Sequence, residues 1–285
     1  GDVYKRQVER TAQDLGLDTE VTAFCPRQDN VEILCITVRN QQEQPRWLTP
    51  IAAVPLYGRS ADNIRDHRNV TSMLHRIWTT ENGVMVRPTM SFDERGHRPN
   101  HKVYYVEGFG PEGQKPEAFY PTVESFLGEG GTYLHPRAVY EQYPGVKAGS
   151  RAEGREAMGA FRFPAITLAP GQEAHYVLLL GVEDSEEAVN AIWDKYHSWE
   201  QVQAVLDETR SYWKEKVNVS FRTGDPDFDN LMKWVCFQPF LRRLFGCSFL
   251  PHHDYGRGGR GWRDLWQDCL SLLLICLLYT SPSPR

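Results

Sequence analysis

The sequence predicts an α+β protein in which a β-sandwich domain comes first, a helical connector follows, and an all-helical domain then begins. Three observations lead to this class. Strand-like segments dominate from about residue 8 to residue 182, helical periodicity takes over from 184 to 216, and further helical stretches follow from about residue 228. No regular alternation of strands and helices occurs, which disfavours a Rossmann-type domain. With 285 residues, 41% of them apolar, the chain is long enough for one large or two smaller domains with real cores.

The strand candidates are rich in β-branched and apolar residues and are bounded by turn residues. They are Val31–Val38, Trp47–Tyr57, Gly83–Met90, Val103–Gly108 and His175–Val182. Turn clusters such as Gly110–Gly113 and Ala169–Gly171 separate them. Many strands over this length predict a large β-sandwich.

Two pairs of residues mark the starts of helices after this region. Asp184 with Glu187, and Ser198 with Gln201, have capping-box spacing. Apolar residues at helical spacing follow each pair, so we expect two linked helices over residues 184–216.

A third helical stretch is expected over about Phe228–Phe245. Its apolar residues at helical spacing are Phe228, Leu231, Trp234 and Val235. Pro239 falls inside this stretch and should kink or break it.

Composition excludes several classes of function. The formal net charge is -5 and the pI is near 6.0, so no basic footprint for nucleic acid is expected. None of the six cysteines forms a C-x-x-C pair, which disfavours a zinc site. The N-terminus has no signal-peptide pattern, and the apolar run Leu270–Tyr279 is shorter than the roughly 20 residues that a membrane span needs. We therefore expect a cytoplasmic protein with no membrane or nucleic-acid partner and no metal.

Both ends of the chain resemble translated adapter sequence. They are residues 1–7 (GDVYKRQ) and 278–285 (LYTSPSPR). We therefore expect the natural protein to continue beyond about residue 277 and this chain to be a fragment.

The densest group of chemically active residues lies near the C-terminus. Asp264 and Asp268 are four apart at the start of a helix expected from about Trp262, and Gln267 lies on the same face. The preceding Gly-rich loop, Asp254–Gly261, adds basic side chains. Three carboxylates, three arginines and two histidines fall here, namely Asp254, Asp264, Asp268, Arg257, Arg260, Arg263, His252 and His253.

Acidic residues at the start of a helix do not by themselves indicate catalysis, because the helix dipole favours them there without any function. The dipole also lowers a carboxyl pKa, so a general acid here would need burial or a neighbouring carboxylate. The glycines at 256, 258 and 261 fit a dinucleotide fingerprint, but the preceding segment is helical rather than a strand. No Gly-x-Ser-x-Gly elbow is present, which weakens a serine hydrolase.

The segment Gly261–Asp268 resembles the G-(aromatic)-R-D-x-x-Q-D signature of glycoside hydrolase family 94. This family contains cellobiose, laminaribiose and 1,2-β-oligoglucan phosphorylases. Asp229–Gln238 is similar to the helix that precedes the signature, although Met232 stands where many members have Asn. The family's order of regions is a β super-sandwich, a helical linker and an (α/α)6 barrel.

The resemblance implies a domain division for this chain. A β-sandwich domain would span residues 8–183, a helical linker 184–220, and the first part of a truncated (α/α)6 catalytic barrel 221–277, with non-native ends at 1–7 and 278–285.

The resemblance also implies an inverting phosphorylase that converts a β-linked gluco-disaccharide or oligosaccharide to a sugar 1-phosphate. Asp264 would be the general acid, and inorganic phosphate, the co-substrate, would attack from the opposite face. Arg263, Gln267 and Asp268 would hold the sugar or position the acid, with Arg257 and Asp254 as weaker candidates. No cofactor is implied.

Two alternatives stay open. One is a carbohydrate-binding or structural module without catalysis, because most of the barrel would be missing and the fragment alone is expected to be inactive. The other is a hydrolase of the same fold. The full-length protein is a candidate homodimer, and the sequence names neither the sugar nor its linkage.

Overall fold

The computed structural model describes residues 6–12, 15–58, 68–93, 96–217 and 219–245. The chain divides inside helix α6 (Trp199–Lys216). Residues 6–206 form one unit, here called the β unit, and described residues from 207 onward belong to a second, here called the helical unit. A large antiparallel sheet followed by helices confirms the mixed α+β class. The described residues show no barrel.

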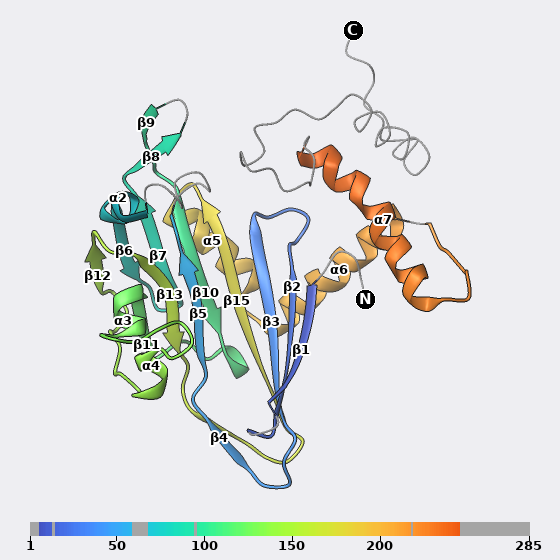
Figure 1. Cartoon of the computed structure of the whole chain (residues 1–285), viewed down its shortest axis with the longest axis horizontal. Helices are drawn as coiled ribbons and strands as arrows, with labels where there is room; N and C mark the ends of the chain where they lie inside the picture. Colours follow the sequence, from blue (N-terminus) through green and yellow to red (C-terminus); the bar gives the residue numbers. More distant parts are fainter. Residues whose placement is uncertain (1–5, 13–14, 59–67, 94–95, 218, 246–285) are drawn as a thin grey trace. The chain divides into compact units, whose positions relative to one another are not determined.

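The β unit is built on one eight-stranded sheet whose neighbours all pair antiparallel (Figure 1). In spatial order its strands are β1 (Arg6–Ala12), β2 (Leu17–Phe24), β3 (Val31–Asn40), β15 (Glu173–Glu183), β10 (Val103–Phe109), β7 (Gly83–Pro88), β6 (His75–Thr79) and β12 (Arg151–Glu153).

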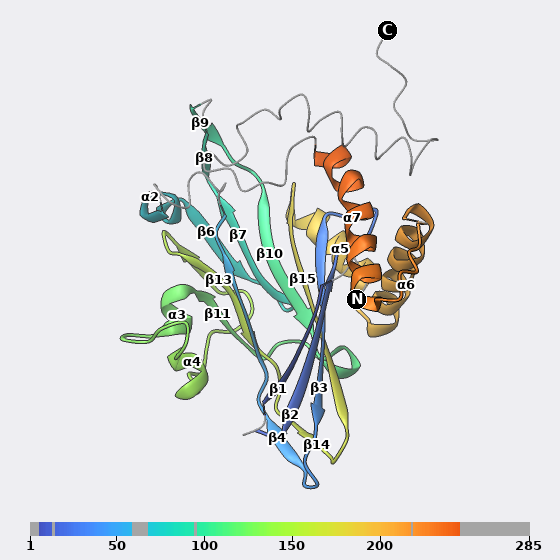
Figure 2. The same ribbon diagram turned by 45° about the vertical axis from the view of Figure 1, so that its right-hand side comes forward.

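Three smaller sheets accompany the large one. They are β11 (Ala118–Thr122), β13 (Ala157–Arg162) and β5 (Ile51–Leu56); β14 (Ile166–Leu168) with β4 (Arg46–Leu48); and β8 (Met90–Asp93) with β9 (Gly96–Pro99). In Figure 2, β13 lies beside β7 of the large sheet, and β4 with β14 lies near the lower end of the β unit. Leu56 and Phe161 of the three-stranded sheet pack in one buried core with Val106 and Leu178 of the large sheet. The two sheets therefore form two packed layers, as in a sandwich.

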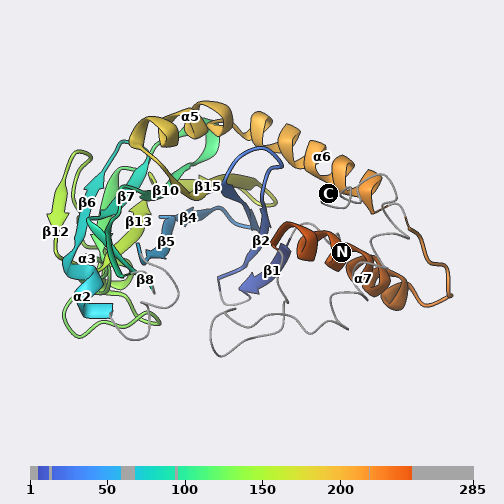
Figure 3. The same cartoon turned by 90° about the horizontal axis from the view of Figure 1, so that it is seen from above.

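Helices cover the opposite face of the large sheet. Figure 3, seen from above, shows α5 (Glu186–Tyr196) lying across this face. Ile33 and Tyr105 of the sheet share a buried core with Val189 of α5 and Val202 of α6. The sheet is therefore apolar on both faces along its centre.

Short helices complete the β unit. They are α2 (Arg68–Met73), the 3-10 turn η1 (Pro111–Gly113), α3 (Val123–Leu127) and α4 (Arg137–Tyr140). Phe126 of α3 and Ala138 of α4 pack with Tyr120 and Met158, so these two helices cover the outer side of the three-stranded sheet.

Three of the five expected strands are confirmed, since β3, β10 and β15 contain residues 31–38, 103–108 and 175–182. The single strand expected over Trp47–Tyr57 is wrong, because residues 49 and 50 interrupt it and separate β4, which pairs with β14, from β5, which pairs with β13. Pro50 has no N–H to donate to a ladder, and its carbonyl accepts from Phe163. The strand expected over Gly83–Met90 ends at Pro88, and Met90 starts β8.

The two helices expected over residues 184–216 are confirmed as α5 and α6, and so is the second capping box. Ser198 Oγ accepts from the Gln201 backbone N–H at 3.3 Å, and Gln201 Oε1 accepts from the Ser198 N–H at 3.1 Å. The first capping box is wrong by one residue. Ser185 is the N-cap of α5 and accepts from the Ala188 N–H at 3.2 Å, while Asp184 pairs with Lys102.

In the helical unit, α7 (Pro226–Phe245) starts two residues earlier than expected. Asp225 caps it by accepting the N–H groups of residues 227 and 228, and Pro226 fits the first helical position. The break expected at Pro239 does not occur, because α7 continues to Phe245. Its expected apolar stripe is exposed, with Leu231 at 54%. In the described part of the chain no helix is long and apolar enough to cross a membrane.

Candidate functional site

All six site residues predicted from the sequence lie outside the described residues. They are Asp254, Arg257, Arg263, Asp264, Gln267 and Asp268. Their spatial arrangement therefore stays a prediction. In the β unit, two groups of polar side chains have a defined geometry: a band across three strands and a buried carboxyl group.

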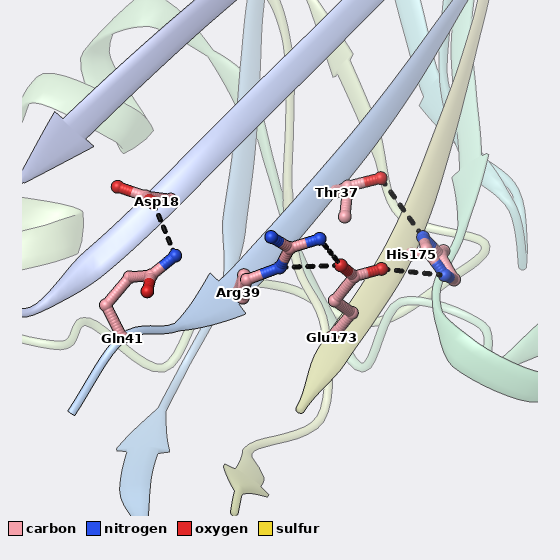
Figure 4. Close-up of polar contacts among 6 residues, drawn as sticks. All are labelled: Asp18, Thr37, Arg39, Gln41, Glu173 and His175. Atoms are coloured by element: carbon pink, nitrogen blue, oxygen red, sulfur yellow. Dashed lines mark hydrogen bonds and ion pairs between the residues drawn. The ribbon is translucent and has the colours of Figure 1, made fainter. Parts of the chain in front are cut away.

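The polar band consists of Asp18, Thr37, Arg39, Gln41, Glu173 and His175 (Figure 4). Strand register explains why they meet. Arg39 of β3 lies opposite Asp18 of β2 and Glu173 of β15, and Thr37 lies opposite His175. Residues directly opposite on neighbouring strands point to the same face of a sheet. Here that face is the one that α5 and α6 cover, because Cys35 and Val177, two residues along each strand, belong to the helix-side core.

Hydrogen bonds and ion pairs link the band from strand to strand. The Arg39 guanidinium donates to Glu173 Oε1, with Nε at 2.6 Å. His175 Nδ1 and Thr37 Oγ1 are 3.1 Å apart, and His175 Nε2 lies 3.9 Å from Glu173 Oε2. The Gln41 amide donates to Asp18. The His175 ring stacks on Trp199 of α6, with centroids 4.3 Å apart and planes at 15°.

A shallow hollow of about 230 Å³ lies beside the band. It is lined by Glu9, Arg10, Thr11, Asp18, Thr19, Glu20, Thr37 and Arg39. Both carboxylates of the band already accept hydrogen bonds, and Arg39 is half exposed, so its pair with Glu173 contributes about 0–1 kcal/mol. The arrangement joins β2, β3 and β15 and offers a polar surface, rather than a nucleophile with a base.

Glu107 is a fully buried carboxyl group among the described residues of the β unit, with an exposed fraction of 0%. Its Oε1 accepts from Thr80 Oγ1 at 3.1 Å, and its Oε2 has no hydrogen-bond partner among the described residues. The Thr80 oxygen accepts in turn from two backbone N–H groups, those of residues 82 and 83. Burial raises the pKa of Glu107 to about 7; the Thr80 hydrogen bond opposes this shift, and the negative charge of Glu186 adds to it.

Gly83, on the neighbouring strand β7, lets the backbone of β10 approach closely beside Glu107. The two residues lie opposite each other, and a Cβ at Gly83 would stand 2.0 Å from the backbone oxygen of Val106. A carboxyl with this pKa can hold a proton near neutral pH. Because Glu107 is fully buried, it is out of reach of a substrate and its role is structural.

Sequence reasoning missed both groups, for different reasons. A signal for Glu107 was present, since it is the lone charged residue in the apolar segment Val103–Phe109. The polar band left no signal, because its members come from strands more than 130 residues apart, as the pairing of Arg39 with Glu173 shows. Among the described residues no cluster of three or more His, Cys, Asp or Glu side chains is arranged to hold a metal ion.

Comparisons with known protein families identify most of the β unit. Residues 5–199 match the family model described as glycosyl hydrolase 94, supersandwich domain. No curated protein matches the chain. Among solved structures, a polysaccharide lyase is similar at a TM-score of 0.33 and 9% sequence identity; the match covers 65% of this chain and 22% of the lyase. The chain thus spans about a fifth of that protein's length, and a likeness this weak carries no argument about function.

Proposed function

The chain belongs to the glycosyl hydrolase 94 family, and from that premise we propose that it is part of an inverting glycoside phosphorylase. Its substrate would be a β-linked gluco-disaccharide or oligosaccharide, and its product a sugar 1-phosphate. The observation that carries the proposal is the supersandwich match over residues 5–199. The signature-like segment Gly261–Asp268 supports it from the same chain, downstream of the matched domain.

The proposed chemistry uses Asp264 as the general acid, which protonates the leaving glycosidic oxygen. Phosphate attacks the anomeric carbon from the opposite face and inverts its configuration. Phosphate is already a nucleophile, so a protein base is not required. Arg263, Gln267 and Asp268 would bind the sugar or position the acid, and Arg257 and Asp254 would line the same pocket.

The domain organisation is part of the same proposal. Residues 8–183 would form the sandwich, 184–220 the linker and 221–277 the first part of an (α/α)6 barrel, with the phosphate-binding residues further downstream. The complete protein would be cytoplasmic and would assemble as a homodimer.

The test measures sugar 1-phosphate release by the protein that the complete gene encodes, with and without added phosphate, on cellobiose, laminaribiose and sophorose. We expect turnover of one of these only when phosphate is present. Asp264→Asn should lower kcat by roughly 10²–10⁴-fold, the usual contribution of a general acid, without changing the circular dichroism spectrum. Asp194→Asn, at an exposed carboxylate on α5, is the matched control and should retain full activity.

Three results would contradict this proposal. Equal release of free glucose with and without phosphate would indicate a hydrolase of the same fold. Near-normal turnover by Asp264→Asn would remove the acid from that position. Sugar binding by the complete protein without any turnover would indicate a non-catalytic module.

A further inference from the structure

A second hollow of the β unit lies at the opposite edge of the large sheet from the polar band. Its volume of about 440 Å³ falls within the roughly 300–1,000 Å³ of small-molecule pockets. We call it the edge pocket. Strands β6 and β12 contribute Trp78 and Arg151, which lie directly opposite each other in the register, and the first turn of α5 contributes Glu186. The pocket therefore lies on the helix-covered face of the sheet.

The walls of the edge pocket are fixed by hydrogen bonds. The loop that carries Gly149 is tied to Thr79 on β6 in both directions: the Gly149 N–H donates to the Thr79 carbonyl at 2.9 Å, and the Thr79 N–H donates to the Ser150 carbonyl at 3.0 Å. The Thr79 hydroxyl also donates to the Lys147 carbonyl at 2.9 Å. Gly149 has a φ of 82°, a backbone conformation that other residues rarely adopt. This rim is preorganised, so a ligand would not have to order it.

Two other lining groups are already engaged. Thr80 uses its hydroxyl on Glu107 and on backbone N–H groups, and Glu81 pairs with Lys115. The side chains of Arg151 and Glu186 differ, because neither makes a hydrogen bond or ion pair with another described residue. The Trp78 indole N–H is buried and has no acceptor within the described chain. The edge pocket thus offers a ligand one exposed cationic donor, Arg151, and one exposed anionic acceptor, Glu186, beside the ring of Trp78, whose buried N–H takes no part.

We propose that the edge pocket is an accessory binding site for a neutral β-linked gluco-oligosaccharide, separate from the catalytic residues. A sugar presents hydroxyl groups that both donate and accept, which suits a pocket lined by both a guanidinium and a carboxylate. Its C–H faces suit the partly exposed Trp78 ring. An anionic ligand would be repelled by Glu81 and Glu186, and a cationic ligand would be repelled by Arg151. The lining therefore favours a neutral ligand.

The choice of gluco-oligosaccharide rests on the proposed function, whereas the pocket's preference for a neutral polyhydroxylated ligand rests on its own residues. The test is isothermal titration of the whole 285-residue chain with cellotetraose, laminaritetraose and sophorotetraose. At least one should bind. Arg151→Gln and Glu186→Gln should each weaken that binding tenfold or more, as the loss of a charged hydrogen bond predicts. Arg98→Gln, at an exposed arginine outside the pocket, is the matched control and should bind like the parent chain.

Both pocket substitutions are at polar side chains without partners among the described residues, so unchanged circular dichroism spectra are expected. Absence of binding for all three sugars would overturn the proposal. Binding that survives both substitutions, or that disappears in Asp264→Asn instead, would place the sugar elsewhere and also overturn it.

The outcomes separate this proposal from the preceding one. Binding by the chain that depends on Arg151, with no phosphorolysis by the complete protein, would contradict only the proposed function. Phosphorolysis by the complete protein, with no binding to the chain that depends on Arg151 and Glu186, would overturn only the edge pocket.

Discussion

Replacing the buried Glu107 by glutamine should stabilise the β unit above neutral pH and change it little near pH 5. Burial raises the pKa of this carboxyl from 4.5 to about 7. The folded protein therefore binds the proton more tightly than the unfolded chain. The free energy of unfolding that this group contributes is fully present below pH 4.5 and is lost as the pH rises to about 7. At about 1.4 kcal/mol for each pH unit between the two pKa values, the loss amounts to about 3 kcal/mol.

Glutamine resembles the protonated acid in shape and keeps an oxygen that can accept from Thr80. It cannot ionise, so it escapes the loss. The assay is urea denaturation of the parent chain and Glu107→Gln at several pH values, followed by far-ultraviolet circular dichroism. The difference in unfolding free energy between the two proteins should grow by about 2–3 kcal/mol from pH 5 to pH 8. Because the two proteins are compared at each pH, the contributions of all other titrating groups to the unfolding free energy cancel.

Glu43→Gln, at an exposed carboxylate in the turn after β3, is the control and should track the parent chain at every pH. A stability difference for Glu107→Gln that does not change with pH would refute the reasoning. So would a difference that shrinks from pH 5 to pH 8, because that would mean the pKa of Glu107 is lowered by folding rather than raised.

Three further predictions concern a close backbone approach, a helix cap and a side-chain hydrogen bond. Gly83→Ala should destabilise the β unit by about 1–3 kcal/mol, because the new Cβ would stand 2.0 Å from a backbone oxygen of β10; an unchanged midpoint in urea would contradict this. Ser185→Ala should cost about 1 kcal/mol as the loss of an N-cap, and Asp184→Ala should cost less, as an exposed ion pair; the reverse order in thermal melts would restore the capping assignment made from sequence. Tyr196→Phe removes a hydrogen bond of 2.5 Å to a carboxylate and should cost about 1.5–3 kcal/mol at pH 7. Burial alone would raise the pKa of that carboxylate, Asp29, but hydrogen bonds from Lys195 and Tyr196 hold it below its usual value. The cost should therefore shrink as the pH falls through this lowered pKa, and a cost that stays constant over the whole acid range in which the protein is folded would count against this account.

Local patterns in the sequence determined the central strands of the large sheet and the helices that follow it. The apolar, β-branched segments at 31–38, 103–108 and 175–182 became strands because their residues favour a pleated, buried surface. Ser198 and Gln201 start α6 because a capping box needs only residues three apart. The family resemblance drawn from residues 229–268 is matched by the supersandwich domain found upstream, over residues 5–199.

Only the tertiary structure decided which side chains meet and how deeply they are buried. Arg39 meets Glu173 because of strand register, and Trp78, Arg151 and Glu186 surround one pocket because an edge strand returns beside β6 and α5 crosses the same face. The raised pKa of Glu107 depends on the same layers, since a carboxyl in a strand is desolvated only when helices and sheets pack over it. Such contacts join residues that are far apart in the sequence, so neither hydrophobic periodicity nor motif spacing can predict them. Sequence patterns determined the central strands, the helices after them and the family, while packing determined the electrostatics of Glu107 and the contacts of the polar band.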